Sequence, residues 1–198
     1  MEHFKMTEEE FNKYWETKYP ESPPIKHELK WIYKDRWFRI HSLPESKRYA
    51  ETDAEYQIIL DRQNKLINDL FGEENKIIIS FGLYTDEITN DNYTELTEFG
   101  EFKKVQKINL HKIRPEYYKH GEFFAIYIKN DFWKSEAKNE ILKAIANDEI
   151  RAMFICPSRE CIIAPYDGGV DIVVKSIEKR NELKNKYKDW LSERKDGL

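Results

Sequence analysis

The sequence predicts an α+β fold in which a mostly antiparallel central sheet is covered by three to four amphipathic helices. Three observations lead to this prediction. Short apolar segments of strand length follow one another through short turns, helical segments lie at both ends and between groups of strands, and aromatic residues make up 14% of the 198 residues. Aromatic side chains bury enough area to support a core. A long helix before a buried strand could also form a crossover, so a mixed sheet is the alternative.

The first helix is predicted at residues 7–17. Thr7 and Glu10 have the spacing of a capping box, in which hydroxyl and carboxylate cover backbone N–H groups at the helix start. Three prolines within Tyr19–Pro24 then end the helix and form an extended linker. We therefore expect residues 1–24 to form an N-terminal helix and Pro-rich linker, and residues 25–198 to form a single α+β domain.

The middle of the chain begins with two predicted short strands, Leu29–Tyr33 and Trp37–Ile40. Thr52 starts a second capping box. The helix that follows runs to Phe71, because its apolar residues recur every three or four positions and a glycine comes next. Lys76–Tyr84 is predicted as a central strand, since apolar residues occupy both of its faces.

The second half of the chain is predicted to combine five strands with two helices. The expected strands are Lys104–Ile113, Glu122–Ile128, Ile150–Cys156, Cys161–Tyr166 and Val170–Val174. Ser135 is expected to cap a helix that reaches Asn147, and Ser176 to cap a final amphipathic helix. Between the last two strands, Asp167-Gly168-Gly169 is expected to supply the positive-φ residues of a tight hairpin.

Composition excludes several classes of protein. No apolar run approaches the roughly 20 residues that cross a bilayer. The acidic N-terminus lacks the apolar segment of a secretory signal. We therefore expect a cytoplasmic protein that does not bind membranes. The net charge of −4 also argues against a general nucleic-acid binder, which is usually basic.

The two cysteines, Cys156 and Cys161, flank a four-residue segment that is typical of a hairpin loop. Such a loop would place them opposite one another, close enough for a cross-strand disulfide. In a reducing cytosol two buried or half-buried thiols are the favoured interpretation. Two cysteines at this spacing form neither a structural zinc site nor a CxxC redox motif.

The densest group of polar and aromatic residues lies in Arg36–Tyr49. Its candidate binding residues are Arg36, Trp37, Arg39, His41, Lys47, Arg48 and Tyr49. On a strand, Trp37, Arg39 and His41 share one face, where the cations could converge on an anion and an aromatic ring could stack a base. The structural alternative, which we favour, is an edge strand whose arginine stems cover aromatic neighbours and pair with acidic residues.

A second candidate is the pair Asp167 and Asp171 in the predicted hairpin. Two carboxylates four residues apart could hold a metal or act as acid and base. However, an Asp followed by Gly is what a tight turn requires, and an outward carboxylate on a strand is ordinarily solvated. The structural interpretation is again favoured.

Recognised catalytic patterns are absent from the sequence. It contains no GxSxG, Walker A, GxGxxG or HExxH motif and no Cys/His zinc pattern. Among the histidines only His41 has neighbours, Ser42 and Glu45, that could make it a general base. We therefore predict no catalytic residue, no metal ligand and no cofactor.

Charge is unevenly distributed along the chain. Ile25–Ala50 carries seven Lys or Arg against three Asp or Glu, and Lys103–His120 carries six against one. Between them, Asp86–Glu101 holds six acidic residues with no Lys or Arg. Such blocks can steer a partner of opposite charge.

Four segments resemble an uncharacterised bacterial family known as a domain of unknown function. They are Arg36–Tyr49 (RWFRIHSLPESKRY), Arg62-Gln63-Asn64, Ala146–Ile150 (ANDEI) and Ala164–Ile172 (APYDGGVDI). The similarity spans most of the chain from about Trp31 onward. It implies a compact intracellular bacterial α+β protein, and it brings no established reaction and no catalytic residues.

The favoured hypothesis is a non-enzymatic cytoplasmic binding protein that recognises a protein partner. A toxin-neutralising immunity protein is one such role. Asp86, Glu87 and Asp91 in the acidic segment would steer the chain onto a basic partner such as a nuclease.

The alternative hypothesis is an enzyme or sensor that acts on a phosphate-bearing ligand. Arg36, Arg39, His41, Lys47 and Arg48 would then form the anion cradle, and the two hairpin carboxylates would supply acid–base or metal chemistry. A third and weaker hypothesis is RNA binding through stacking on Trp37 and Phe38, against which the net acidity counts.

Overall fold

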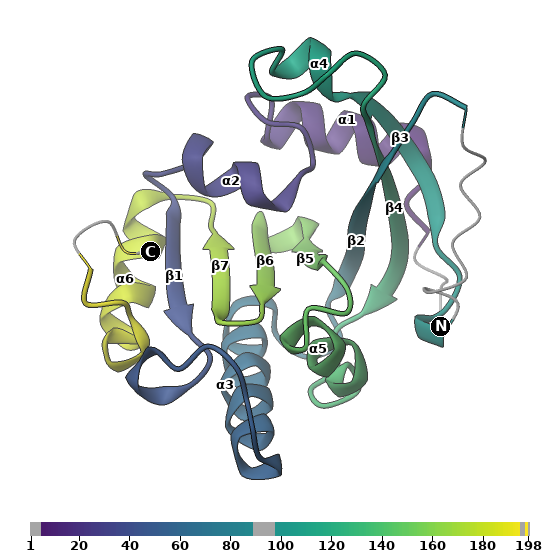
Figure 1. Cartoon of the computed structure of the whole chain (residues 1–198). Coiled ribbons are helices and arrows are strands. Elements are labelled where there is room, and N and C mark those ends of the chain that lie inside the picture. The colour runs from purple at the N-terminus through teal and green to yellow at the C-terminus, as the bar shows by residue number, and fades with distance from the viewer. Residues whose placement is uncertain (1–4, 89–97, 195–196, 198) are drawn as a thin grey trace.

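The computed structural model describes residues 5–88, 98–194 and 197, and its centre is a seven-stranded sheet (Figure 1). The strand order is β1-β7-β6-β5-β2-β4-β3, and every neighbouring pair is antiparallel. The strands are β1 Trp37–His41, β2 Lys76–Thr85, β3 Lys103–Asn109, β4 Phe123–Phe132, β5 Ala152–Cys156, β6 Cys161–Tyr166 and β7 Gly169–Val173. The predicted α+β class with an antiparallel sheet is confirmed, and the mixed-sheet alternative is not.

Helices cover both faces of this sheet. The α-helices of the described residues are α1 Glu8–Lys18, α2 Lys26–Ile32, α3 Asp53–Phe71, α4 Leu110–Ile113, α5 Asn139–Ala146 and α6 Ile177–Lys186. Residues of α1 and α2 share one hydrophobic cluster with one face of the strands, whereas α3, α5 and α6 share a second cluster with the opposite face. The protein is therefore a three-layer α/β/α arrangement around an antiparallel sheet.

The prediction of a strand at Leu29–Tyr33 is wrong, because this segment lies mostly in α2. Ile25, Leu29 and Tyr33 are all buried and recur every four residues, which is the spacing of one helical face. A short apolar run can fit the two-residue period of a strand or the 3.6-residue period of a helix. Here the helix buries all three side chains against the sheet.

Two other boundaries also differ from prediction. The expected strand Lys104–Ile113 ends at Asn109, whose side chain accepts a hydrogen bond from the Lys112 N–H and caps α4. Ser135 does not cap α5, whose N-cap is Lys138. Glu136 has a positive φ of 65°, and a right-handed helix cannot pass through that conformation. The capping box of α1 and the caps of α3 and α6 at Thr52 and Ser176 are confirmed.

The hairpin between β6 and β7 needs Gly169 for space and not for backbone conformation. Neither Gly168 nor Gly169 has a positive φ, which corrects the predicted role of Asp167-Gly168-Gly169. A Cβ on Gly169 would lie 2.2 Å from the carbonyl oxygen of Ile40 on β1. The absence of a side chain at Gly169 therefore allows β1 to approach β7.

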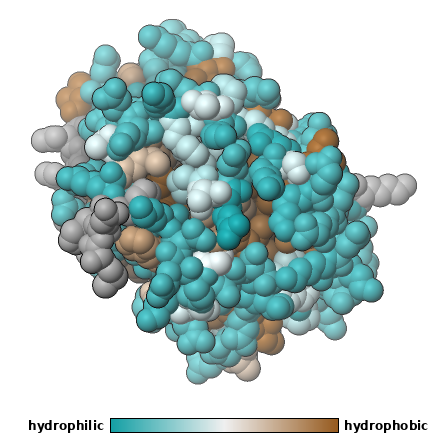
Figure 2. Space-filling view, turned by 180° about the vertical axis from the view of Figure 1, so that it is seen from behind, coloured by the Kyte–Doolittle hydropathy of each residue, from teal (hydrophilic) through white to brown (hydrophobic). Residues whose placement is uncertain are grey.

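The N-terminal helix is part of the core. Phe11 and Trp15 of α1 are buried in the cluster on the α2 face, and the Trp15 indole N–H donates to the Ser22 carbonyl at 2.6 Å. No helix within the described ranges is both long and apolar enough to cross a bilayer. The face turned away from the viewer in Figure 1 is mostly hydrophilic, and its hydrophobic residues show in small, separate areas (Figure 2).

Cys156 and Cys161 lie directly opposite one another in the β5–β6 hairpin, as the loop spacing predicts. Both are buried free thiols. Burial raises the pKa of the Cys161 thiol above its ordinary value, which disfavours the reactive thiolate.

Candidate functional site

The candidate site lies on the α2 face of the sheet, where one row of side chains crosses several strands. Ser80 on β2 pairs with Met153 on β5. Ala164 on β6 pairs with Asp171 on β7, and Asp171 pairs with Arg39 on β1. Met153 and Ala164 also adjoin, because they lie one step beyond the Phe154–Ile163 pair of β5 and β6. Strand alternation thus places these five side chains on one face.

Arg39 and Asp171 form a fork-to-fork ion pair. The Arg39 Nε donates to Asp171 Oδ1 at 2.8 Å and its Nη2 donates to Oδ2 at 2.9 Å. The Trp37 indole N–H donates to Oδ1 at 3.0 Å. The guanidinium also lies 4.7 Å from the centre of the Tyr166 ring. Three donors therefore hold the Asp171 carboxylate, and the paired groups are largely buried.

The hairpin carboxylate Asp167 is likewise paired. Its side chain is only 6% exposed, and its Oδ2 accepts from the Nε of Arg48 at 2.8 Å. The Arg48 side chain is 64% exposed, and its guanidinium lies 5.1 Å from the centre of the Tyr49 ring. Asp167 therefore anchors Arg48 at the rim, where the rest of the arginine faces solvent.

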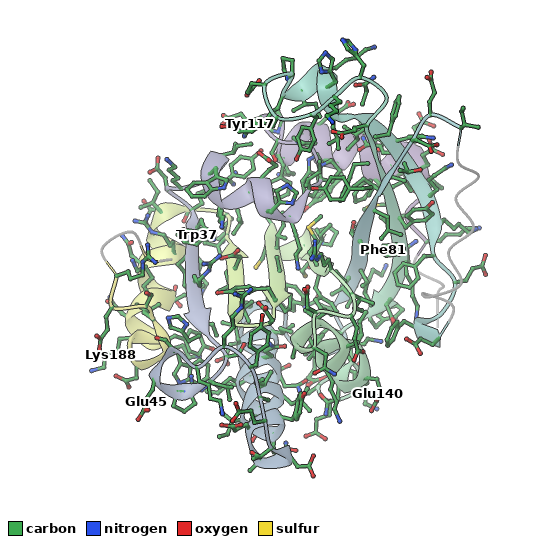
Figure 3. All side chains as sticks on the ribbon, in the orientation of Figure 1. Trp37, Glu45, Phe81, Tyr117, Glu140 and Lys188 are labelled. Atoms are coloured by element: carbon green, nitrogen blue, oxygen red, sulfur yellow. The ribbon has the colours of Figure 1, made fainter. Side chains whose placement is uncertain are left out.

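A cavity of about 540 Å³ lies over β1, β7 and β6. It is lined by Lys26, His27 and Lys30 of α2, Arg39 and His41 of β1, Ser46, Arg48, Ala164, Tyr166, Gly168, Asp171 and Arg194. We call it the basic cavity, because five of these residues are Lys or Arg and only one is acidic. Trp37 and Phe81 are labelled in Figure 3 and mark β1, which lines this cavity, and β2, which lies two strands beyond β6.

Lys26 is the most perturbed cation of the basic cavity. Its Nζ donates to the carbonyl oxygen of Pro165 on β6 at 2.9 Å. Burial lowers the pKa of Lys26 to about 8, an effect that the carboxylate of Asp171 partly opposes. Burial, and then the positive charge of Arg39, also lower the pKa of Lys30. Burial is the main cause of both shifts, and an anion bound nearby would oppose it by stabilising the charged forms.

His41 presents an unsatisfied ring nitrogen in the same region. Its Nε2 is buried with no hydrogen-bond partner, while its backbone carbonyl accepts from Arg62. Burial, and then the charges of Arg39 and Arg62, lower the pKa of His41. The ring is therefore held neutral near pH 7, and Nε2 can accept from or donate to a ligand depending on the tautomer.

Not every predicted site residue joins the basic cavity. The Arg36 guanidinium lies 4.8 Å from the centre of the Tyr33 ring, and the Lys47 ammonium pairs with Glu51 and Glu55. Neither residue lines the cavity. Trp37 and Tyr49 do not line the cavity either. The Trp37 indole donates to Asp171, and the Tyr49 ring lies beside the Arg48 guanidinium.

The acidic segment lies elsewhere. Asp86 and Glu87 are exposed beyond the end of β2, and Asp91 lies outside the described residues. The hypothesis of a protein partner recognised through this segment stays a prediction.

Sequence reasoning missed Lys26 and Lys30. Both lie on α2, and Lys30 falls within the segment Leu29–Tyr33, for which the sequence predicts a strand. The available signal was the four-residue spacing of Lys26, Lys30 and Lys34 alongside that of Ile25 and Leu29. That double pattern indicates a helix with one apolar and one basic face.

The arrangement is suited to holding an anion and poorly suited to acid–base or metal chemistry. Both candidate carboxylates are engaged by arginines. In the part of the chain that the structure describes, no group of three or more His, Cys, Asp and Glu side chains could hold a metal ion.

Comparisons with known proteins place this fold in a family. Neither a curated protein nor a solved structure matches the chain. A family model does match residues 25–195, and its description is "Domain of unknown function (DUF3885)". The match covers all seven strands and every residue that lines the basic cavity. The chain therefore belongs to the DUF3885 family.

Proposed function

We propose that this protein binds a phosphate-bearing ligand in the basic cavity and acts as a cytoplasmic binding or sensor protein. One observation carries the proposal. Five Lys and Arg residues from α2, β1 and the segments around them surround one concave space, and Asp171 is the single carboxylate among the described residues that line it. Concave sites with convergent polar groups are where small ligands bind.

A phosphate group suits the disposition of these cations. Phosphate offers several oxygens that accept charge-assisted hydrogen bonds from different directions. Lys26 and Lys30 come from the helix above the sheet, whereas Arg48 comes from the loop after β1. The donors therefore approach one volume from separate elements. The lowered pKa values of Lys26 and Lys30 support the same conclusion, because a bound anion would stabilise their charged forms.

The state of the carboxylates favours binding over catalysis. A general base needs a free lone pair within reach of the proton it removes. The Asp171 oxygens accept from Trp37 and twice from Arg39, and Asp167 is buried against Arg48. A protein that only senses or carries the ligand needs the cations to bind the phosphate and does not need a free carboxylate.

Isothermal titration calorimetry with inorganic phosphate at low ionic strength tests this function. We expect saturable binding to the full-length protein, and a weakening of about tenfold in Lys30→Gln, because a hydrogen bond to a charged group contributes about 1.5–3 kcal/mol. Lys13→Gln is the matched control, since Lys13 is an exposed lysine of α1 outside the cavity. Absence of saturable binding, or equal weakening in both variants, would refute the proposal.

A further inference from the structure

We infer that the phosphate-bearing ligand is an aryl phosphate, with its ring in a second cavity on the other side of Lys26. This inference rests on the proposed phosphate site and specifies its ligand. The second cavity, which we call the apolar cavity, has a volume of about 230 Å³ and lies over β5 and β2. Lys26 and His27 line both cavities, so the two spaces adjoin at these residues.

The walls of the apolar cavity are suited to a flat ring. Ile150, Met153 and Phe124 contribute apolar surface, and the charged residues Asp148, Glu149 and Arg151 also line the cavity. A Cβ on Gly82 would lie 2.0 Å from the Phe124 ring, so this ring packs directly on the bare backbone of β2. Phe124 and Tyr84 meet edge to face, with ring centres 5.1 Å apart. Aromatic walls favour an aromatic guest through such edge and stacking contacts.

Ser80 marks the floor of the apolar cavity. The residue is fully buried, and its hydroxyl oxygen has no hydrogen-bond partner. A buried hydroxyl without a partner carries a cost in free energy, and a polar substituent on a ligand would remove that cost. Ser80 faces the cavity from β2, in register with Met153 of β5.

The spacing of the two cavities fits one small molecule. Met153 lies on the floor of the apolar cavity and Asp171 on that of the basic cavity, two strands apart in the sheet. Neighbouring strands are separated by about 4.8 Å, so these floors are about 10 Å apart. In an aryl phosphate the ring centre and the phosphorus lie about half this distance apart, so both groups would lie close to Lys26 and His27, where the two cavities adjoin. The apolar cavity is large enough for the ring, since a protein cavity of about 150 Å³ holds benzene.

Lys26, which lines both cavities, places a cation between the expected positions of the ring and the phosphate. The Lys26 ammonium donates to the Pro165 carbonyl on β6, and Asp171 and Arg151 are among the charges that act on it. Arg151 lines the apolar cavity and Asp171 the basic one. Lys26 is therefore placed to contact the phosphate while its aliphatic stem borders the ring.

Calorimetry with methyl phosphate and phenyl phosphate tests the inference. Both are phosphate monoesters, so they differ mainly in the group that would enter the apolar cavity. We expect phenyl phosphate to bind at least about tenfold more tightly than methyl phosphate, because the ring leaves water for an apolar site. Ser80→Leu, which fills the apolar cavity, should abolish this preference while methyl phosphate binds as before. Ser80→Ala keeps the cavity open and should retain the preference.

The possible failures are distinguishable. If methyl phosphate binds but phenyl phosphate gains nothing, or if Ser80→Leu keeps the full preference, the aryl inference is wrong and the phosphate site stands. If neither ester nor inorganic phosphate binds, both the inference and the proposed function are wrong. Circular dichroism and thermal melting test whether Ser80→Leu folds. If that variant does not fold, Met153→Phe is a second variant that fills the apolar cavity.

Discussion

Arg39 and Asp171 face each other in register across β1 and β7, and two hydrogen bonds of 2.8 and 2.9 Å join the guanidinium to the carboxylate. Their side chains are only 12% and 15% exposed. This pair has two consequences for the site. It fixes the arginine within the basic cavity, and it reduces the net positive charge there.

Asp171→Asn is expected to destabilise the protein and to strengthen phosphate binding. Removing one partner of a largely buried ion pair leaves the other charge uncompensated, which costs about 3 kcal/mol in the free energy of unfolding. The same uncompensated Arg39 raises the positive charge of the cavity. Urea unfolding and phosphate calorimetry measure the two effects, with Asp189→Asn as an exposed control. Weaker phosphate binding would show instead that the carboxylate itself takes part in recognition.

The two glycines of the β6–β7 hairpin should respond very differently to alanine. A Cβ at Gly169 would meet the Ile40 carbonyl of β1 at 2.2 Å, whereas a Cβ at Gly168 would meet only side-chain atoms, the nearest at 3.1 Å. We expect Gly169→Ala to cost about 3 kcal/mol of stability, because backbone must move. Gly168→Ala should stay within about 1 kcal/mol of the wild type. Equal losses in urea unfolding would contradict the close approach of β1.

Lys26→Met should make the protein more stable at pH 7. The pKa of Lys26 falls from 10.5 to about 8 on folding, mainly through burial, so the charged form costs about 3 kcal/mol. The cost is fully present below pH 8. It declines between pH 8 and 10.5, where the unfolded chain binds the proton that the folded protein has released. The stability gain from Lys26→Met should therefore shrink over that interval in thermal or urea unfolding, and Lys13→Met should show no such pH dependence.

Methyl phosphate binding should weaken as the pH rises through about 8. The ammonium form of Lys26 attracts the anion, and the free protein loses that charge near its pKa of about 8. The charges of Asp171, Asp167, Asp148 and Arg151 also act on this ammonium. A phosphate monoester is already dianionic there, since its second pKa is about 6. Calorimetry from pH 7 to 9.5 measures the loss, and a pH-independent affinity would rule out contact between Lys26 and the phosphate. Lys26→Met should bind weakly at pH 7 and lack this pH dependence.

Local interactions explain which parts of the fold were predictable. Thr7, Thr52 and Ser176 each cap a helix through a backbone N–H only three residues away, so the sequence alone locates those helix starts. The hairpin that pairs Cys156 with Cys161 is equally local. By contrast, the buried positions of α2 fit both the period of a strand and the period of a helix. Only packing against the sheet decides between the two.

The sequence by itself determined the α+β class, the antiparallel strands and the N-caps of α1, α3 and α6, because each depends on neighbouring residues and on the alternation of apolar and polar positions. Tertiary structure alone decided which charges meet. Lys26 and Pro165 are 139 positions apart and Arg39 and Asp171 are 132 apart, yet all four lie at one face of the sheet. No local pattern specifies such contacts. The strand order and the position of α2 on the sheet depend on burying both faces of the sheet at once.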